Sequence, residues 1–108
     1  MVKNILDQAN IKNCETRFIQ PPQTTYAVYH DSYNAGGADN MNLFKEHDYT
    51  IELYSYEVDK DAEKRIEAIL KERGIDYEKQ ERYWIEEEQL YQVIYEFSML
   101  LKDTKEKI

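Results

Sequence analysis

The fold is decided by residues 47–74, "HDYTIELYSYEVDKDAEKRIEAILKERG", because their hydrophobic period changes half-way along. Apolar and polar side chains alternate in residues 47–56, which predicts a β-strand with Tyr49, Ile51 and Leu53 on one side. From residue 60 the apolar residues recur at helical spacing: Ala62, Ile66, Ile69 and Leu70. The segment therefore predicts a strand followed by an amphipathic helix over about 60–73.

The ends of this helix carry recognisable signals. Asp59 is placed to cap the first turn, and Gly74 is placed to end the last turn in a left-handed conformation. Acidic residues in the first turn suit the helix dipole. On the exposed side we expect two ion pairs at i,i+4 spacing, Asp61–Arg65 and Glu67–Lys71.

The chain before this unit predicts one helix and one strand. Apolar residues at positions 2, 5, 6 and 9 indicate a short amphipathic N-terminal helix that fades into residues 10–13. Residues 16–20 are expected to be briefly extended before Pro21-Pro22, which excludes helix. Residues 25–31, "TYAVYHD", read as a strand, and residues 33–42, with two of the three glycines, as a flexible loop.

The chain after Gly74 predicts two further strands. Residues 75–85 are expected to form one of them, with a turn at Glu86-Glu87-Glu88. Residues 90–101 alternate as a strand, although a helical stripe also fits them. We predict a strand because Tyr, Val, Ile and Phe dominate. The charged tail, 102–108, is expected to be solvated.

These elements assemble into one α+β domain covering residues 1–108. The predicted fold is a four-stranded, mainly antiparallel sheet, with the N-terminal helix and the helix at about 60–73 packed on one face. The hairpin strands alternate in polarity, so the other face should be left to tyrosines and polar residues.

The composition limits the possible partners. A formal charge of −8 argues against ordinary nucleic-acid binding and against docking on anionic membranes, since both need cations. Ten tyrosines among 108 residues favour an assembly protein, because tyrosine suits interfaces that are partly wet. A β-rich composition explains the same surplus.

The compartment is expected to be a reducing one. Cys14 is the only cysteine, so it cannot form an intrachain disulfide. The N-terminus lacks the apolar run of a signal peptide, and no segment is long and apolar enough to span a bilayer. We expect a cytoplasmic product.

The repeated His-Asp pairs, His30-Asp31 and His47-Asp48, are weak candidates for a metal site. In a symmetric hairpin His30 lies opposite His47, with Val28 opposite Tyr49. Asp31 and Asp48 then point to the other face, which leaves the ligand shell incomplete. Two unrelated histidines at the polar end of a hairpin are the simpler interpretation.

No other residue pattern indicates catalysis or a cofactor. Three consecutive glutamates at a turn are expected to be solvated, and Gly36-Gly37 lacks the context of a phosphate loop. Cys14 has no neighbour that would activate a thiolate. Trp84 stands in a charged stretch, where it serves either the core or an interface. We therefore expect neither an enzyme nor a cofactor-binding protein.

Residues 48–102 resemble the C-terminal half of the small tail-terminator, or tail-completion, proteins of long-tailed phages and prophages. The resemblance rests on "YTIELYS", on the acidic-capped "AEKRIEAIL" and on the closing "LYQVIYEF". Upstream, "PPQTTYAVYHDS" fits the same pattern of a proline followed by a tyrosine-rich strand. It is a pattern of elements that carries no catalytic residues.

The resemblance implies a structural role in virion assembly. Subunits of such proteins close into a homo-oligomeric ring that ends the tail tube or joins head to tail, so their partners are other copies and the tube or connector proteins. The protein would pass from the host cytoplasm into the tail or neck of the virion. Four aromatic residues are candidate ring contacts: Tyr29, Tyr54, Tyr56 and Trp84.

Two other classes of function stay open at this point. An acidic protein of this size suits an inhibitor that mimics DNA on a basic host protein, although its carboxylates are scattered among lysines. A small metal-dependent or ligand-binding protein built around His30 and His47 is the second alternative.

Overall fold

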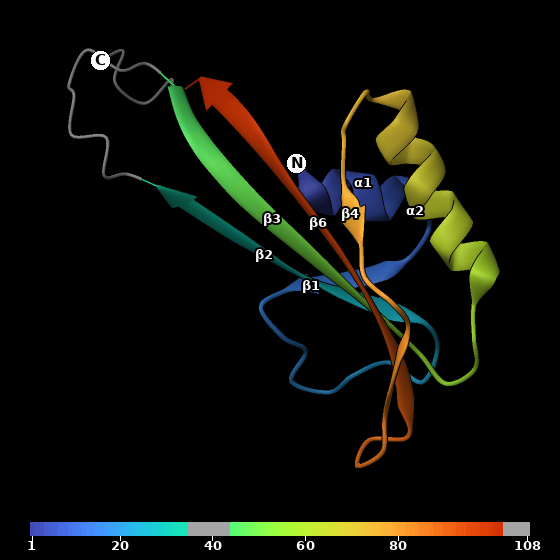
Figure 1. The fold of residues 1–108 in the computed structure, drawn as a ribbon. Helices are drawn as coiled ribbons and strands as arrows, with labels where there is room; N and C mark the ends of the chain where they lie inside the picture. The colour runs from blue at the N-terminus through green and yellow to red at the C-terminus, as the bar shows by residue number, and fades with distance from the viewer. Residues whose placement is uncertain (35–43, 103–108) are drawn as a thin grey trace.

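A computed structural model of the chain describes residues 1–34 and 44–102. The loop expected at 33–42 therefore lies outside the described residues, apart from its first two positions, which continue a strand, and so does all of the 102–108 tail beyond residue 102. Figure 1 shows the described elements, which in chain order are α1 (Val2–Gln8), β1 (Lys12–Glu15), β2 (Tyr26–Asn34), β3 (Phe44–Ser55), α2 (Lys60–Glu72), β4 (Glu78–Lys79), β5 (Tyr83–Ile85) and β6 (Leu90–Lys102).

The helix α2 begins and ends where its sequence signals predict. The carboxylate of Asp59 accepts a hydrogen bond from the backbone N–H of Ala62 at 3.0 Å, and a second one from the hydroxyl of Thr25 at 2.6 Å. Gly74 follows the helix with φ +70°, and the N–H of Ile75 bonds back to the carbonyl of Leu70 at 2.9 Å. This closes the last turn in the way that a left-handed glycine permits.

Among the described residues the sheet has six strands, in the order β1-β2-β3-β6-β4, and β5 also pairs with β6. The three long strands run antiparallel, with Val28 opposite Glu52 and Ile51 opposite Tyr95. β1 pairs in parallel with β2, which makes the sheet mixed. The α+β class is confirmed, whereas the expectation of four strands is wrong.

Two local predictions also differ from the structure. Residues 75–85 do not form one strand, because only 78–79 and 83–85 pair with β6 and the charged residues between them do not. The extended segment near the N-terminus is at 12–15 and not at 16–20, because Thr16 has φ +74° and ends the strand. The last apolar segment is a strand, as predicted.

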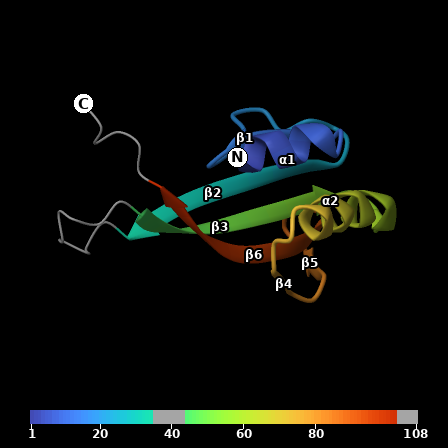
Figure 2. The same cartoon turned by 90° about the horizontal axis from the view of Figure 1, so that it is seen from above.

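Both helices pack on one face of the sheet, where the main core lies (Figure 2). The predicted stripes of α1 and α2 are buried against the central strands, and Ile51, Ile66 and Tyr95 have no exposed surface. A smaller cluster lies on the other face, where Phe18 of the 16–25 loop packs edge-on against Tyr26. We call this second face the open face, because neither helix of the described chain covers it.

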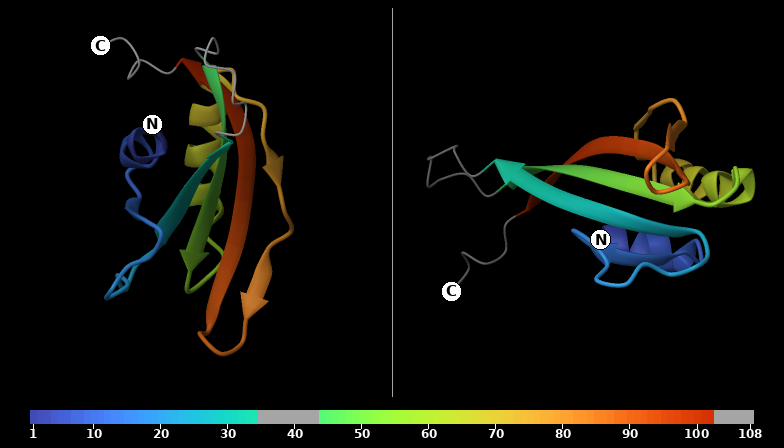
Figure 3. Two further views of the ribbon diagram at one scale, coloured as in Figure 1. Left: turned by 90° about the vertical axis from the view of Figure 1, so that its left-hand side faces the viewer. Right: turned by 90° about the horizontal axis from the view of Figure 1, so that it is seen from below.

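The three long strands continue beyond their shorter neighbours, as Figures 1 and 3 show. β1 accompanies β2 only as far as Tyr29, and β4 accompanies β6 only as far as Glu96. We call residues 30–34, 44–50 and 97–102 the arm, and the rest of the described chain the body. Tyr49 and Phe97 are buried at the base of the arm, and farther out its side chains are more exposed, with Leu100 at 66%.

Within the described residues, neither helix has the length and apolar character that crossing a membrane requires.

Candidate interaction surfaces

The two histidines do not meet, because the hairpin register differs from the symmetric one. His30 lies opposite Thr50 and His47 lies opposite Tyr33, a shift of three residues from the expected pairing. An odd shift moves one strand's side chains to the other face. His30 is therefore on the open face and His47 on the helix side, which contradicts the expected pair.

Each histidine has a carboxylate neighbour of its own. Nε2 of His30 lies 3.4 Å from Glu52, and Nδ1 of His47 lies 2.9 Å from Asp31. The ring of His47 also stacks on Tyr49, with centroids 5.7 Å apart. Across residues 1–34 and 44–102, no three side chains of the metal-binding types gather closely enough to hold an ion.

The open face carries carboxylates and a hydrogen-bonded tyrosine. The hydroxyl of Tyr54 donates to Glu52 at 2.8 Å and accepts from the amide of Gln92 at 3.0 Å. Burial, together with the neighbouring carboxylate of Glu52, raises the pKa of Tyr54 well above its ordinary value. Glu96 accepts from Gln80 at 3.1 Å, and Asp48 accepts from Ser98 at 2.5 Å. The face is thus acidic and aromatic.

The predicted interface aromatics are divided between several surroundings. Tyr54 is on the open face, stacked on Tyr26 with ring centroids 5.2 Å apart. Tyr56 is 46% exposed, and its hydroxyl donates to the carbonyl of Pro22 at 3.2 Å. Tyr29 packs against the main core on the helix side, so its expected outward placement is wrong.

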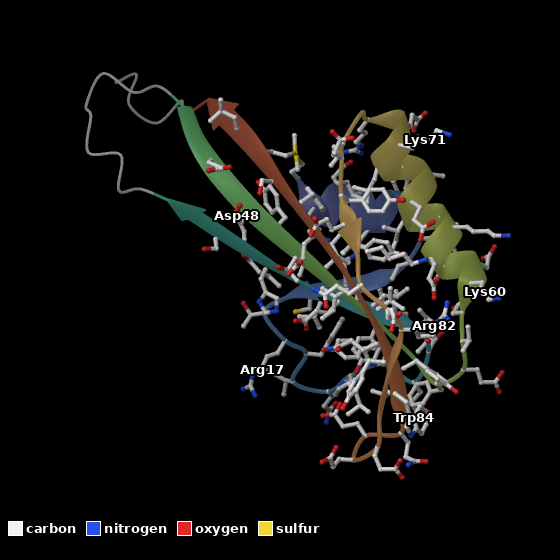
Figure 4. All side chains as sticks on the ribbon, viewed as in Figure 1. Arg17, Asp48, Lys60, Lys71, Arg82 and Trp84 are labelled. Atoms are coloured by element: carbon white, nitrogen blue, oxygen red, sulfur yellow. The ribbon has the colours of Figure 1, made fainter. Side chains whose placement is uncertain are left out.

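Trp84 lies near the end of the sheet opposite the arm, beside the turn that joins β5 to β6 (Figure 4). Its indole ring lies 4.7 Å from that of Tyr91, and its Nε1–H donates to Glu86 at 3.0 Å. The side chain is 36% exposed and its neighbour Tyr83 is 62% exposed. This end of the body therefore presents aromatic surface to solvent.

A buried carboxylate joins α2 to the segment before β5, and sequence reasoning placed it only in the first helical turn. Glu63 is 4% exposed and forms a bidentate ion pair with Arg82, with one N–O distance of 2.8 Å. It also accepts from Lys79 at 2.9 Å. The burial of Glu63 could have been predicted from its position in the helix, because it follows the apolar Ala62 on the side of α2 that packs against the sheet.

The expected pair Glu67–Lys71 is replaced by a contact across the fold. Glu67 lies 2.7 Å from Lys79 and accepts from the hydroxyl of Tyr95, also at 2.7 Å. Burial alone would raise the pKa of Glu67, but the hydrogen bonds from Lys79 and Tyr95 outweigh it and hold the pKa below its ordinary value. The other expected pair, Asp61–Arg65, is present at 2.9 Å.

These groups border a basic hollow of about 220 Å³ on the helix side. We call it the basic hollow. Its lining is Lys60, Glu63, Lys64, Glu67, Lys79 and Arg82. Four cations against two carboxylates give a local charge of +2, in a chain whose formal charge is −8. Figure 4 shows Arg82 beside α2 and Lys60 at the start of that helix.

A second hollow, of about 670 Å³, lies where α1, β1 and the start of α2 approach one another. Charges of both signs border it, among them Lys3, Asp7, Asp59 and Arg65. Neither histidine is part of its lining, nor is Cys14. Its carboxylates are engaged, because Asp7 pairs with Lys3 at 3.0 Å and Asp59 caps α2. This arrangement holds the N-terminal elements together and offers no paired acid and base.

A comparison with models of protein families finds no match to this sequence, and a comparison with curated proteins finds none either.

Proposed function

We propose that the protein is a structural subunit that assembles into a homo-oligomeric ring, of the kind that closes the tail tube or joins head to tail in long-tailed phages. It works through contact surfaces and not through catalysis. A ring is built from head-to-tail contacts, so each subunit needs two different surfaces that fit one another.

The observation that carries this proposal is the opposite character of the two sides of the sheet. The open face presents the carboxylates of Asp48, Glu52 and Glu96, and of these Glu52 is hydrogen-bonded to Tyr54. The helix side presents the basic hollow. Complementary charge favours association between unlike faces and disfavours association between like ones.

In the proposed contact, the acidic open face of one subunit docks against the basic hollow of the next. Exposed lysines of the hollow, such as Lys64, reach the carboxylates, while Glu63 keeps Arg82 and Lys79 in place underneath. Tyr54 adds apolar area with a hydroxyl that tolerates water. The acidic remainder of the ring repels DNA that passes through it.

Light scattering coupled to size exclusion tests the proposal over a range of protein and salt concentrations. We expect one closed oligomer that forms as protein concentration rises and dissociates as salt screens the charges. Lys64→Glu and Glu96→Lys should each weaken the oligomer at least about tenfold, which corresponds to about 1.4 kcal/mol. Circular dichroism should show that both variants stay folded.

Lys12→Glu is the matched control, because it makes the same charge change on the exposed edge strand β1. It should leave the oligomer intact. A wild-type protein that stays monomeric at every concentration would contradict the ring. If such a monomer also bound a basic nuclease, the acidic DNA mimic would replace the ring as the proposed function.

A further inference from the structure

The free edge of β6 in the arm is an unused row of hydrogen-bonding groups. The backbone carbonyl of Ile94 accepts from the N–H of Gln80 in the direction of β4, so this residue points away from β3. Backbone groups alternate in direction along a strand. Ser98, Leu100 and Lys102 therefore point their N–H and C=O groups the same way, and β4 ends before it reaches them. Within the described chain no other strand pairs with this edge.

This edge is only lightly protected from pairing, because its one charged residue, Lys102, stands at the outer end of the strand and no proline interrupts it. Natural sheet edges are shielded by charge, by proline, by bulges or by being very short. The two outermost strands of the body are protected in this way, since β1 has four residues and β4 has two, with exposed Lys12 and Lys79. The arm edge of β6 instead exposes Leu100, whose exposed fraction is 66%.

The rest of the fold determines the direction in which a partner strand can approach. If the partner strand ran parallel to β6, the body of the second subunit would lie beside the body of the first. It would then collide with β4, which pairs with the same edge of β6 at Tyr95 and Glu96. A strand that runs antiparallel places its body beyond the tip of the arm, on the side away from β4. The antiparallel direction is therefore the open one.

We infer that the arm edge of β6 pairs with the same edge of a second copy, antiparallel and about a two-fold axis at Leu100. This register matches Ser98 with Lys102 of the partner subunit and brings the two Leu100 residues opposite one another. It uses every outward-pointing residue of the free run and stops short of β4. The two three-stranded arms then form one continuous sheet.

The corresponding edge of β2 is the less suitable one. Its outward-pointing residues are fewer, because the N–H of Thr16 bonds to the carbonyl of Tyr29 and only Asp31 and Tyr33 follow in that direction. Asp31 already binds His47. A two-fold pairing about Ser32 would also set Asp31 opposite Tyr33 of the partner subunit and leave only these two hydrogen-bonded pairs.

Disulfide trapping tests the inference on the full chain in a Cys14→Ser background. Leu100→Cys places a thiol on the proposed axis, where opposite Cα atoms of a hydrogen-bonded pair are about 5.5 Å apart, a distance that a disulfide can bridge. Under mild oxidation this variant should form a covalent dimer and no larger species. Ser32→Cys, equally on the open face of the arm but on β2, is the matched control and should stay monomeric.

Leu100→Lys supplies the second readout, by sedimentation of the protein without added cysteine. Two lysines at the axis should weaken the dimer at least about tenfold, whereas Ser32→Lys should not. Equal trapping of Ser32→Cys, or unchanged dimerisation of Leu100→Lys, would overturn the inference. So would a wild-type protein that shows no dimer up to about 1 mM.

This contact is independent of the proposed ring, and the variants separate the two. Lys64→Glu alters the basic hollow and should leave the Leu100→Cys dimer intact. Leu100→Lys should leave the ring contact intact. A ring without the arm dimer would overturn only this inference, and an arm dimer without the ring would overturn only the proposed function.

Discussion

The body and the arm share the same three strands but differ in what surrounds them. In the body two helices cover one face, Ile51 and Tyr95 are fully buried, and short charged strands close both edges. In the arm Tyr49 and Phe97 are the last buried residues, Leu100 is 66% exposed, and both edges lack a partner among the described residues. We infer that the body accounts for the stability of the fold and that the arm makes contacts with another subunit.

The largest expected difference between body and arm is in the effect of substitutions on stability. Substitutions in the core of the body should lower the free energy of unfolding much more than substitutions in the arm. Ile66→Ala removes a side chain with no exposed surface from the centre of the main core. It should lower the free energy of unfolding by about 2–5 kcal/mol, measured by urea denaturation. Leu100→Ala, on the arm, should change it by less than about 0.5 kcal/mol. Equal losses would show that the arm is part of the core.

The buried carboxylate of the body gives the second largest expected effect. Glu63→Ala leaves Arg82 and Lys79 without their shared partner, and because both cations are about one-third exposed we expect a loss of about 2–3 kcal/mol. Asp61→Ala, two positions earlier on α2, breaks only an exposed pair with Arg65 and should cost about 0.5 kcal/mol. A small loss for Glu63→Ala would mean that water replaces the carboxylate there.

The smallest predicted effect concerns acid. The pKa of Glu67 is lowered in the folded state, so its contribution to stability is present above the ordinary pKa of about 4.3 and is lost as pH falls below that value. Glu67→Gln should therefore lose less stability than the wild type between pH 7 and pH 3. Urea denaturation at several pH values measures this, with Glu72→Gln on the same helix as control. Parallel pH profiles for wild type and Glu67→Gln would contradict it.

The sequence predicts the body well where one signal acts alone. The apolar stripe of α2, its Asp59 cap and the glycine at its end agree with the structure, because each depends on residues close in the chain. The alternation in residues 47–56 assigns the correct face to Tyr49, Ile51 and Leu53 for the same reason.

The errors arise where distant residues decide the outcome. The register of the hairpin is shifted by three residues from the symmetric one, which separates His30 from His47, and no local pattern in either strand indicates this shift. Residues 75–85 are expected to form one strand although charge interrupts their alternation, and the structure places Lys79 and Arg82 from this segment in ion pairs with Glu63 of α2. The four residues of β1 show no clear alternation of apolar and polar side chains. This strand is defined by its parallel pairing with the edge of β2.

The candidate surfaces were only partly foreseeable. Tyrosine content indicated an open face, and Tyr54 lies on it, but Tyr29 is packed against the main core. The basic hollow gathers residues from α2 and from the chain after it, which no local pattern brings together. The arm edge of β6 is left unpaired because β4 ends opposite Glu96, and no local sequence pattern indicates where β4 ends.

The central claim is that surfaces left exposed in one subunit are contact surfaces between subunits. Hydrogen exchange of individual backbone amides, compared between dilute and concentrated protein, tests it most directly. We predict that the amides of Ser98 and Leu100 exchange quickly in dilute protein and become protected on concentration, while the buried amide of Ile51 is protected in both. Rapid exchange of Ser98 and Leu100 at both concentrations would contradict the claim for the arm.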